Sequence, residues 1–288
     1  MTLCQPIVPP VFAADALEAM GALYPGRAGP LRHQLRDHPL LSIDALADLA
    51  DALPAAQVEY NPGDLPIGIA PEDVPSNGLS IGETIRTIET NRSWAVLKNI
   101  ETEPDYCTLL MDLLNELRPV VEPCTGAMLT PQGFIFVSSP QSITPFHFDP
   151  EHNILLQLRG AKVMNVWPAG DERFADRREH ERYHTGGHRN LPWRDGFDGD
   201  QQAIALEPGD AVLMPVMAPH FVANGDAPSI SLSITWRSEW SYRESEAHAA
   251  NAALRRLGFD PRMPPRWPRH AYVRTVGWRV LRKMRLVS

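Results

Sequence analysis

The chain has 288 residues, of which 43% are hydrophobic and 22% are charged, and its formal net charge is −8. This composition is typical of a soluble globular protein that can bury a substantial core. Its three cysteines (Cys4, Cys107 and Cys124) are too few and too scattered for a disulfide framework, so we expect a cytoplasmic protein. We expect neither a signal peptide nor a transmembrane helix, because no apolar run is long enough.

The charge is unevenly distributed along the chain. Residues 261–288 carry eight arginine and lysine side chains and no acidic one, which leaves a charge of −16 on the first 260 residues. An acidic body argues against a large nucleic-acid surface. We therefore expect the basic tail to fold onto the acidic body or onto a second subunit.

Residues 1–124 are expected to form a mixed, largely helical flank with proline-rich connections. The stretch LSIDALADLADALP (41–54) has its leucines on one helical face, with Ser42 as an N-cap and Pro54 as a stop signal. The stretch PDYCTLLMDLLNELRP (104–119) is the clearest helix, closed by a proline at each end. Its leucines predict packing against a sheet.

Between residues 125 and 240 the hydrophobic period changes to two, which indicates β-strands. We expect strands in GFIFVSS (133–139), on both sides of a turn near Gly160, and in the segment 207–225, with His220 at a strand end. In SISLSITW (229–236) small polar residues alternate with apolar ones, so one face could line a wet cavity. The predicted fold class is mainly β with flanking helices, as a sandwich or jelly-roll barrel.

Two further stretches lie outside this pattern. Residues 169–200 are long and polar, so we expect a functional loop or lid. Its His180, His184 and His188 are spaced by four, but TGGHRN (185–190) breaks a helix, which favours a solvated lid over a second metal site. Residues 241–288 are expected to form a helical, basic element that serves in dimerisation, with Trp278 in the dimer contact.

His147 and Asp149 lie two residues apart in TPFHFDPEHN (144–153), so on a strand both side chains point to the same face. Chance alone supplies one such pair in a chain with 10 histidines and 35 acidic residues, so the context carries the argument. His220 is the best third ligand, because a closed barrel would bring its segment alongside His147. Two histidines and one carboxylate are the arrangement associated with the facial triad of non-haem Fe(II) oxygenases; a hydrogen-bonded trio without a metal is the alternative.

The stretches TPFHFDPEHNILLQLRGAKVMNVWP (144–168) and EPGDAVLMPVMAPHFVAN (207–224) resemble the JmjC-type, cupin-like 2-oxoglutarate oxygenases. The resemblance is strongest to the branch that includes the hypoxia-inducible factor asparaginyl hydroxylase. It implies a double-stranded β-helix core at residues 125–240 and iron ligands at His147, Asp149 and His220.

The same resemblance implies cosubstrate residues. Lys162 would pair with the distal carboxylate of 2-oxoglutarate, and Thr144 and Asn153 would flank the cosubstrate. The alternatives are a surface lysine beside a turn and two side chains that satisfy backbone groups. Thr235 stands where that hydroxylase has a second asparagine, which leaves the substrate open.

The resemblance therefore implies an Fe(II)- and 2-oxoglutarate-dependent dioxygenase that uses O₂ and releases succinate and CO₂. It would hydroxylate, or demethylate through hydroxylation, a protein side chain or a small molecule, and we expect a homodimer. The alternative is a cupin-like regulatory protein that binds a metal or ligand without turnover. Lys162 favours the enzyme, because a metal sensor needs no partner for a carboxylate at that position.

Overall fold

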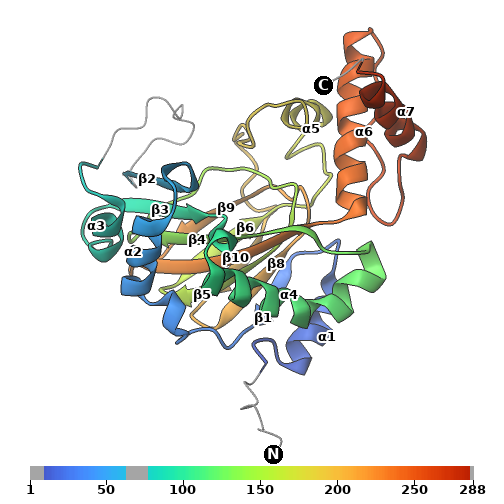
Figure 1. Cartoon of the computed structure of the whole chain (residues 1–288). Helices are drawn as coiled ribbons and strands as arrows, with labels where there is room; N and C mark the ends of the chain where they lie inside the picture. The colour runs from blue at the N-terminus through green and yellow to red at the C-terminus, as the bar shows by residue number, and fades with distance from the viewer. Residues whose placement is uncertain (1–9, 63–76, 286–288) are drawn as a thin grey trace, which may run out of the picture.

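The computed structural model describes residues 10–62 and 77–285, which form two antiparallel sheets with helices around them (Figure 1). The helices are α1 (Ala14–Leu23), α2 (Ile43–Ala52), α3 (Ile81–Arg86), α4 (Pro104–Thr125), α5 (Arg177–Tyr183), α6 (Glu239–Arg256) and α7 (Tyr272–Lys283). The strands are β1 (Gly29–Arg32), β2 (Val58–Pro62), β3 (Ser93–Lys98), β4 (Leu129–Ser138), β5 (His152–Arg159), β6 (Lys162–Val166), β7 (Gln202–Leu206), β8 (Asp210–Met214), β9 (His220–Asn224) and β10 (Ser229–Arg237). The predicted fold class is confirmed.

The large sheet has the order β1-β8-β5-β10-β4-β3-β2, and the small sheet has the order β7-β6-β9. In β10 the apolar side chains belong to the core beneath the helices, whereas Ser231 and Ser233 bond to Lys162 and Asn153 on the opposite face. Because Lys162 belongs to the small sheet, this polar face of β10 lies between the two sheets. The alternation in SISLSITW therefore separates the core from the interior of the barrel, as expected.

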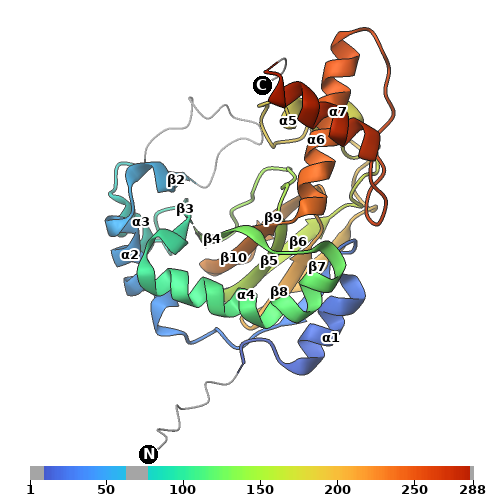
Figure 2. The same cartoon turned by 45° about the vertical axis from the view of Figure 1, so that its right-hand side comes forward.

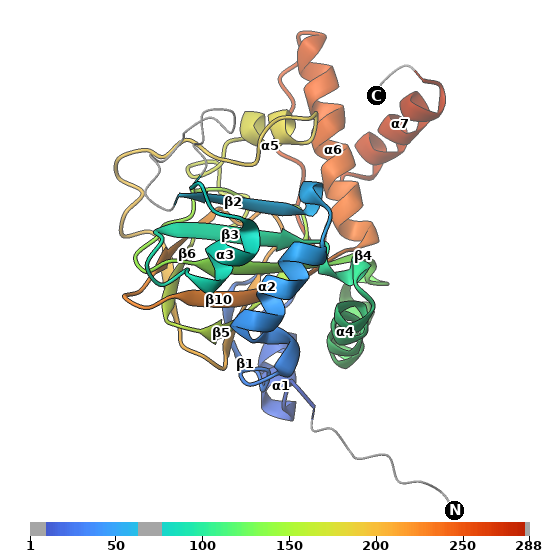
Figure 3. The same cartoon turned by 60° about the vertical axis from the view of Figure 1, so that its left-hand side comes forward.

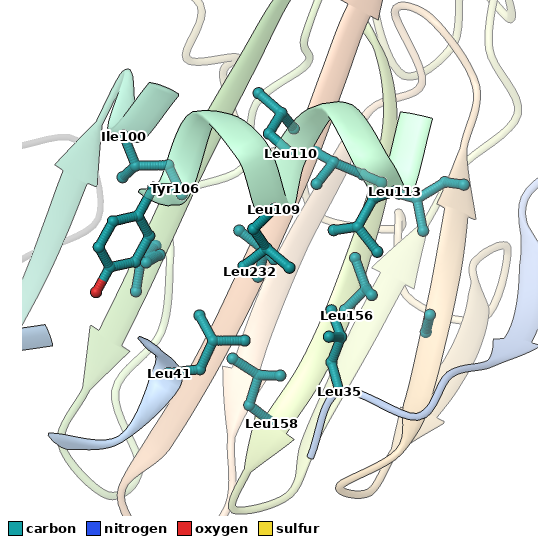
Figure 4. Packing of buried hydrophobic residues seen from close by; sticks show 14 of the residues in the cluster. Leu35, Leu41, Ile100, Tyr106, Leu109, Leu110, Leu113, Leu156, Leu158 and Leu232 are labelled. Carbon is teal, nitrogen blue, oxygen red and sulfur yellow. The ribbon is translucent and has the colours of Figure 1, made fainter. Parts of the chain in front are cut away.

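Helices cover the outer face of the large sheet. Figure 2 shows α4 running across this sheet, and Figure 4 shows its leucines pointing toward leucines of β5 and β10. The labelled residues of this contact include Leu109, Leu110, Leu113, Leu156, Leu158 and Leu232. Helix α2 begins as predicted, since the Ser42 hydroxyl accepts a hydrogen bond from the backbone of Ala45.

The predicted end of the helix at residue 119 is wrong, because α4 continues through Pro119 and Pro123 to Thr125. Both prolines lie on the exposed face, where carbonyl groups left without an N–H partner can bond to water. On the opposite face Leu117 and Val121 are fully buried. Packing of the buried face thus outweighs the lost backbone hydrogen bonds.

The first 124 residues also supply β1, β2 and β3 to the large sheet, which the sequence did not predict. β1 pairs with β8 at one edge, and β3 pairs with β4 toward the other. These strands are short or lack a clean alternation, so they resemble loop sequence. The division of the chain at residues 124 and 240 stays a prediction.

The turn near Gly160 carries the chain from one sheet to the other, since β5 belongs to the large sheet and β6 to the small one. Gly160 has φ +68°, and an added Cβ would lie 2.3 Å from the backbone oxygen of Pro228. Only glycine fits this turn without strain. His220 does not end the preceding strand: β8 stops at Met214, and His220 is the first residue of β9.

The 169–200 segment contains the helix α5, which packs on α6, while α7 packs along α6 (Figure 3). The expectation of a solvated lid is wrong for His180, which is fully buried, and right for His188, which is exposed. Trp278 of α7 packs on Ala249 and Ala250 of α6 within the same chain. No helix in the described ranges has the length and apolar character needed to cross a membrane.

Candidate metal centre and cosubstrate pocket

The structure brings His147, Asp149 and His220 together. The backbone N–H of His147 donates to the His220 carbonyl at 2.9 Å, and that of His220 donates to the His147 carbonyl at 2.8 Å, so the two residues form an antiparallel bridge. One ligand atom from each of the three side chains lies within 4.8 Å of the other two. Asp149 Oδ2 is 3.7 Å from the Nε2 atom of each histidine. The three side chains therefore face one common point.

Hydrogen bonds to backbone carbonyls set the protonation of both imidazoles. His147 Nδ1 lies 2.7 Å from the Pro145 oxygen, and His220 Nδ1 lies 2.9 Å from the Ala218 oxygen. A carbonyl oxygen only accepts, so each Nδ1 carries a proton, and in the neutral form of each ring Nε2 presents its lone pair toward the common point. Metal-binding histidines are commonly oriented in this way. Two neutral imidazoles and one carboxylate fit a divalent transition metal such as Fe(II).

The local electrostatics favour the same protonation states. Burial, together with the nearby His220, lowers the pKa of His147 to about 4. Burial opposes ionisation of Asp149, but His147, Arg189 and His220 together hold the pKa of its carboxyl group below the usual value. At neutral pH His147 and Asp149 are therefore both deprotonated, as metal binding requires.

A short segment of the 169–200 region pairs with the backbone beside the triad. The Phe148 N–H donates to the Arg189 carbonyl, Leu191 N–H donates to the Phe146 carbonyl, and Asn190 forms an antiparallel bridge with His147. Arg189 Nη1 donates to Asp149 Oδ1 at 2.8 Å. Sequence reasoning missed Arg189, because only this backbone pairing brings it to the site.

Lys162 is buried between the two sheets. Its Nζ donates to Ser231 Oγ at 2.6 Å, and that hydroxyl donates to Gln157 Oε1 at 2.8 Å. Within the described residues no carboxylate pairs with this amino group, and burial lowers its pKa to about 7. A buried cation without a counter-ion is unfavourable unless a ligand supplies one. The surface-lysine alternative is therefore wrong.

The strand register relates Lys162 to the triad. In the β6–β9 pair Lys162 lies opposite Asn224, and Val166 lies opposite His220. These positions have the same parity, so Lys162 and His220 project from the same face of the small sheet, roughly 13 Å apart along the strand at ~3.3 Å per residue. The lysine stem and an extended dicarboxylate together can bridge this separation.

Thr144 and Asn153 both make hydrogen bonds within the protein. The Thr144 hydroxyl accepts from the Val222 N–H at 2.8 Å, and Asn153 Oδ1 accepts from the Ser233 hydroxyl at 2.8 Å. Asn153 projects into the barrel interior beside Ser233, whereas Thr144 is bonded to Val222 in the middle of β9. Neither contact tests a cosubstrate role, which stays a prediction for both residues.

His152 lies on the other face of β5, away from the triad. It is buried, its Nε2 lies 2.9 Å from Ser238 Oγ, and its ring stacks on Trp236 with centroids 5.5 Å apart. The one-residue offset from Asn153 places it in the layer between sheet and helices. His152 is therefore a structural residue rather than a ligand.

Comparison with known proteins matches residues 80–242 to the model of the cupin-like domain family. Among curated proteins, Jumonji C domain-containing protein 5 of Drosophila melanogaster is 27% identical over 178 residues, which cover 54% of this chain and 37% of that protein. The matching part of this chain thus covers well under half the length of that relative.

Two solved structures are similar at low identity. The X-ray structure of Escherichia coli ycfD matches with a TM-score of 0.49 and 18% identity, over 93% of this chain and 66% of that chain. The complex of the Escherichia coli ribosomal oxygenase YcfD with cobalt and 2-oxoglutarate matches with a TM-score of 0.48 and 17% identity, over 93% and 65%.

Proposed function

The chain belongs to the cupin-like domain family, whose model covers more than half of it, and on that premise we propose that it is an Fe(II)- and 2-oxoglutarate-dependent dioxygenase. The observation that carries the proposal is the buried Lys162 side chain, whose amino group faces the barrel interior and, when protonated, has no carboxylate partner among the described residues. A metal-binding regulatory protein would have no use for such a cation. A dicarboxylate cosubstrate supplies the missing charge.

Each side chain has a role in this proposal. His147, Asp149 and His220 hold the metal through Nε2, one carboxylate oxygen and Nε2. Bound Fe(II) supplies the activation of O₂ that oxidises a C–H bond. Lys162, oriented by Ser231, binds the distal carboxylate of 2-oxoglutarate. Burial of this contact between the two sheets excludes water and strengthens the ion pair.

The reaction consumes O₂ and 2-oxoglutarate and releases succinate and CO₂. The substrate is a protein side chain or a small molecule, and hydroxylation of an N-methyl group would lead to its loss as formaldehyde. The segment around Arg189 pairs with residues 146–148 beside the triad, so we expect it to contribute to the substrate contact. We propose cytoplasmic location and a homodimer as expectations from the sequence.

Anaerobic titration of the Fe(II)-loaded protein with 2-oxoglutarate tests the proposal. Chelation of the metal by the 2-oxo acid produces a weak charge-transfer band in the visible region. We expect the band in the wild-type protein and a Kd at least about tenfold higher in Lys162→Ala, a difference of about 1.4 kcal/mol. His220→Ala should lose both the metal and the band.

Lys98→Ala is the matched control, because Lys98 lies on the distant strand β3 and pairs with Glu59 of β2. It should titrate like the wild-type protein. A protein that binds Fe(II) through the triad but never develops the band would contradict the oxygenase and favour the regulatory alternative. Succinate release on admission of air would then test turnover directly.

A further inference from the structure

The two oxygens of the Asp149 carboxylate have different partners. Oδ2 lies 3.7 Å from Nε2 of both His147 and His220 and so faces the metal position. Oδ1 accepts a hydrogen bond from Arg189 Nη1 at 2.8 Å. One carboxylate oxygen thus faces the two imidazoles, and the other binds a guanidinium.

Backbone pairing holds Arg189 in this position. Residues 189–191 run antiparallel to residues 146–148, joined by the Phe148–Arg189 and Leu191–Phe146 hydrogen bonds on either side of the His147–Asn190 bridge. The guanidinium therefore approaches Asp149 from a fixed Cα rather than from a free loop. The proximity of Asp149 raises the pKa of Arg189, so the cation is permanent.

Stability is a poor explanation for this ion pair. The Arg189 side chain is 56% exposed and the Asp149 side chain 17% exposed. Ion pairs with one partner largely in water contribute about 0–1 kcal/mol to folding. Moreover, a cation beside the triad opposes metal binding electrostatically. A role of Arg189 in the coordination geometry of Asp149 explains its position better.

The number of oxygens that Asp149 donates decides how many positions remain on the metal. A carboxylate that binds through one oxygen completes a facial triad and leaves three positions open, enough for a chelating 2-oxo acid and O₂. A carboxylate that chelates through both oxygens would occupy one of these positions. A donor fixed on Oδ1 disfavours chelation, because it holds that oxygen away from the metal.

We propose that Arg189 is a positioning residue that keeps Asp149 a one-oxygen ligand and thereby keeps a coordination position open for the cosubstrate. This inference rests on the proposed function. It adds Arg189, a residue of the 169–200 segment, to the site. The segment that pairs with residues 146–148 then contributes to the surroundings of the metal.

Cobalt substitution tests the proposal without turnover, because the visible absorption of Co(II) reports its coordination. In Arg189→Leu the carboxylate should chelate, so Co(II) alone should give bands that differ in intensity from wild type. The Kd of 2-oxoglutarate for the Co(II) protein should rise about 10–100-fold, whereas the Kd of Co(II) should stay equal or fall. Arg189→Lys keeps a donor and a charge and should restore both properties.

Arg194→Leu is the matched control, since Arg194 belongs to the same segment, has a 58% exposed side chain and pairs with Asp176 instead. Its spectrum and affinities should equal those of the wild-type protein. Unchanged bands and an unchanged 2-oxoglutarate Kd in Arg189→Leu would overturn the proposal, as would equal losses in both leucine variants or a loss of Co(II) binding. If wild-type Co(II) protein binds no 2-oxoglutarate, the proposed function fails, while the Co(II) bands alone still decide the role of Arg189.

Discussion

Acidification from pH 7 to pH 5 should destabilise the protein through three histidines between α5 and α6. The His248 ring stacks on those of His180 and His184, with centroids 4.7 and 5.3 Å apart. Both nitrogens of His180, Nε2 of His184 and Nδ1 of His248 are buried without a hydrogen-bond partner in the described part of the chain. Burial lowers the pKa of His180 and of His184 to about 3 and that of His248 well below its usual value.

The charged groups around the stack act mostly in the same direction. Arg266 faces His180 and His248, Arg237 faces His184, and Arg274 faces His248, and each opposes a further positive charge. Asp176 favours protonation of His180 but is outweighed by burial. The folded protein therefore keeps these imidazoles neutral well below the pH at which they ionise in an unfolded chain.

The sign and magnitude follow from linkage. Unfolded imidazoles take up protons below pH ~6.5 while the folded ones stay neutral to about pH 3, so the free energy of unfolding falls as the pH falls through this window. At pH 5 each such histidine costs about 2 kcal/mol, against about 0.2 kcal/mol at pH 7. His180 and His184 together should therefore remove about 4 kcal/mol, a large share of a typical stability of ~5–15 kcal/mol.

Urea unfolding at pH 7 and pH 5 measures this loss, and a variant isolates it from other histidines. His180→Phe places a similar ring between Phe148 and His248 but cannot be protonated. It should reduce the loss between the two pH values by about 2 kcal/mol. The exposed His270→Gln should leave the loss unchanged. An equal loss in wild type and His180→Phe would refute the reasoning.

Three further predictions concern the scaffold. Leu110→Ala should lower the free energy of unfolding, measured in urea, by about 2–5 kcal/mol, because Leu110 lies on the buried face of α4 and is 2% exposed. Met111→Ala should lower it far less, because Met111 is 36% exposed. Gly160→Ala should lower the free energy of unfolding by at least about 1–3 kcal/mol, because the new Cβ would sit at φ +68° and 2.3 Å from the Pro228 backbone oxygen. Gly186→Ala should lower it less, because its φ is +99° but no atom lies within 4 Å of the added Cβ. The expected homodimer should dissociate in Val280→Glu, because Val280 is 50% exposed on α7 beside other apolar side chains; a monomeric wild-type protein in sedimentation velocity would exclude it.

Local patterns predicted which three side chains lie together at the candidate metal centre. His147 and Asp149 share a face because strand-like backbone alternates, and the buried strand before His220 marked the third residue. Lys162 was identified through the family resemblance, which places a lysine on the strand after the Gly160 turn. Each of these positions depends on a few neighbouring residues, so the sequence alone carries the information.

Features that depend on distant pairing escaped prediction. Arg189 reaches Asp149 only because residues 189–191 pair with residues 146–148, and nothing in TGGHRN indicates that pairing. His180 was expected in solvent because its surroundings in sequence are polar, yet α6 covers it. The continuation of α4 past Pro119 likewise depends on the sheet that buries Leu117 and Val121. In each case a tertiary contact outweighs the local preference.

Alternate residues of β10 serve two different properties, stability of the core and binding in the barrel interior, within nine consecutive residues. Its Ile and Leu side chains belong to the apolar core under the helices, while Ser231 and Ser233 hold the groups that face the barrel interior. Substitutions at the first set should change how much protein accumulates in a cell, and those at the second set should change which cosubstrate is accepted. A laboratory selection could therefore vary the pocket along one strand while leaving expression almost constant, and variants in this stretch should sort by odd and even position.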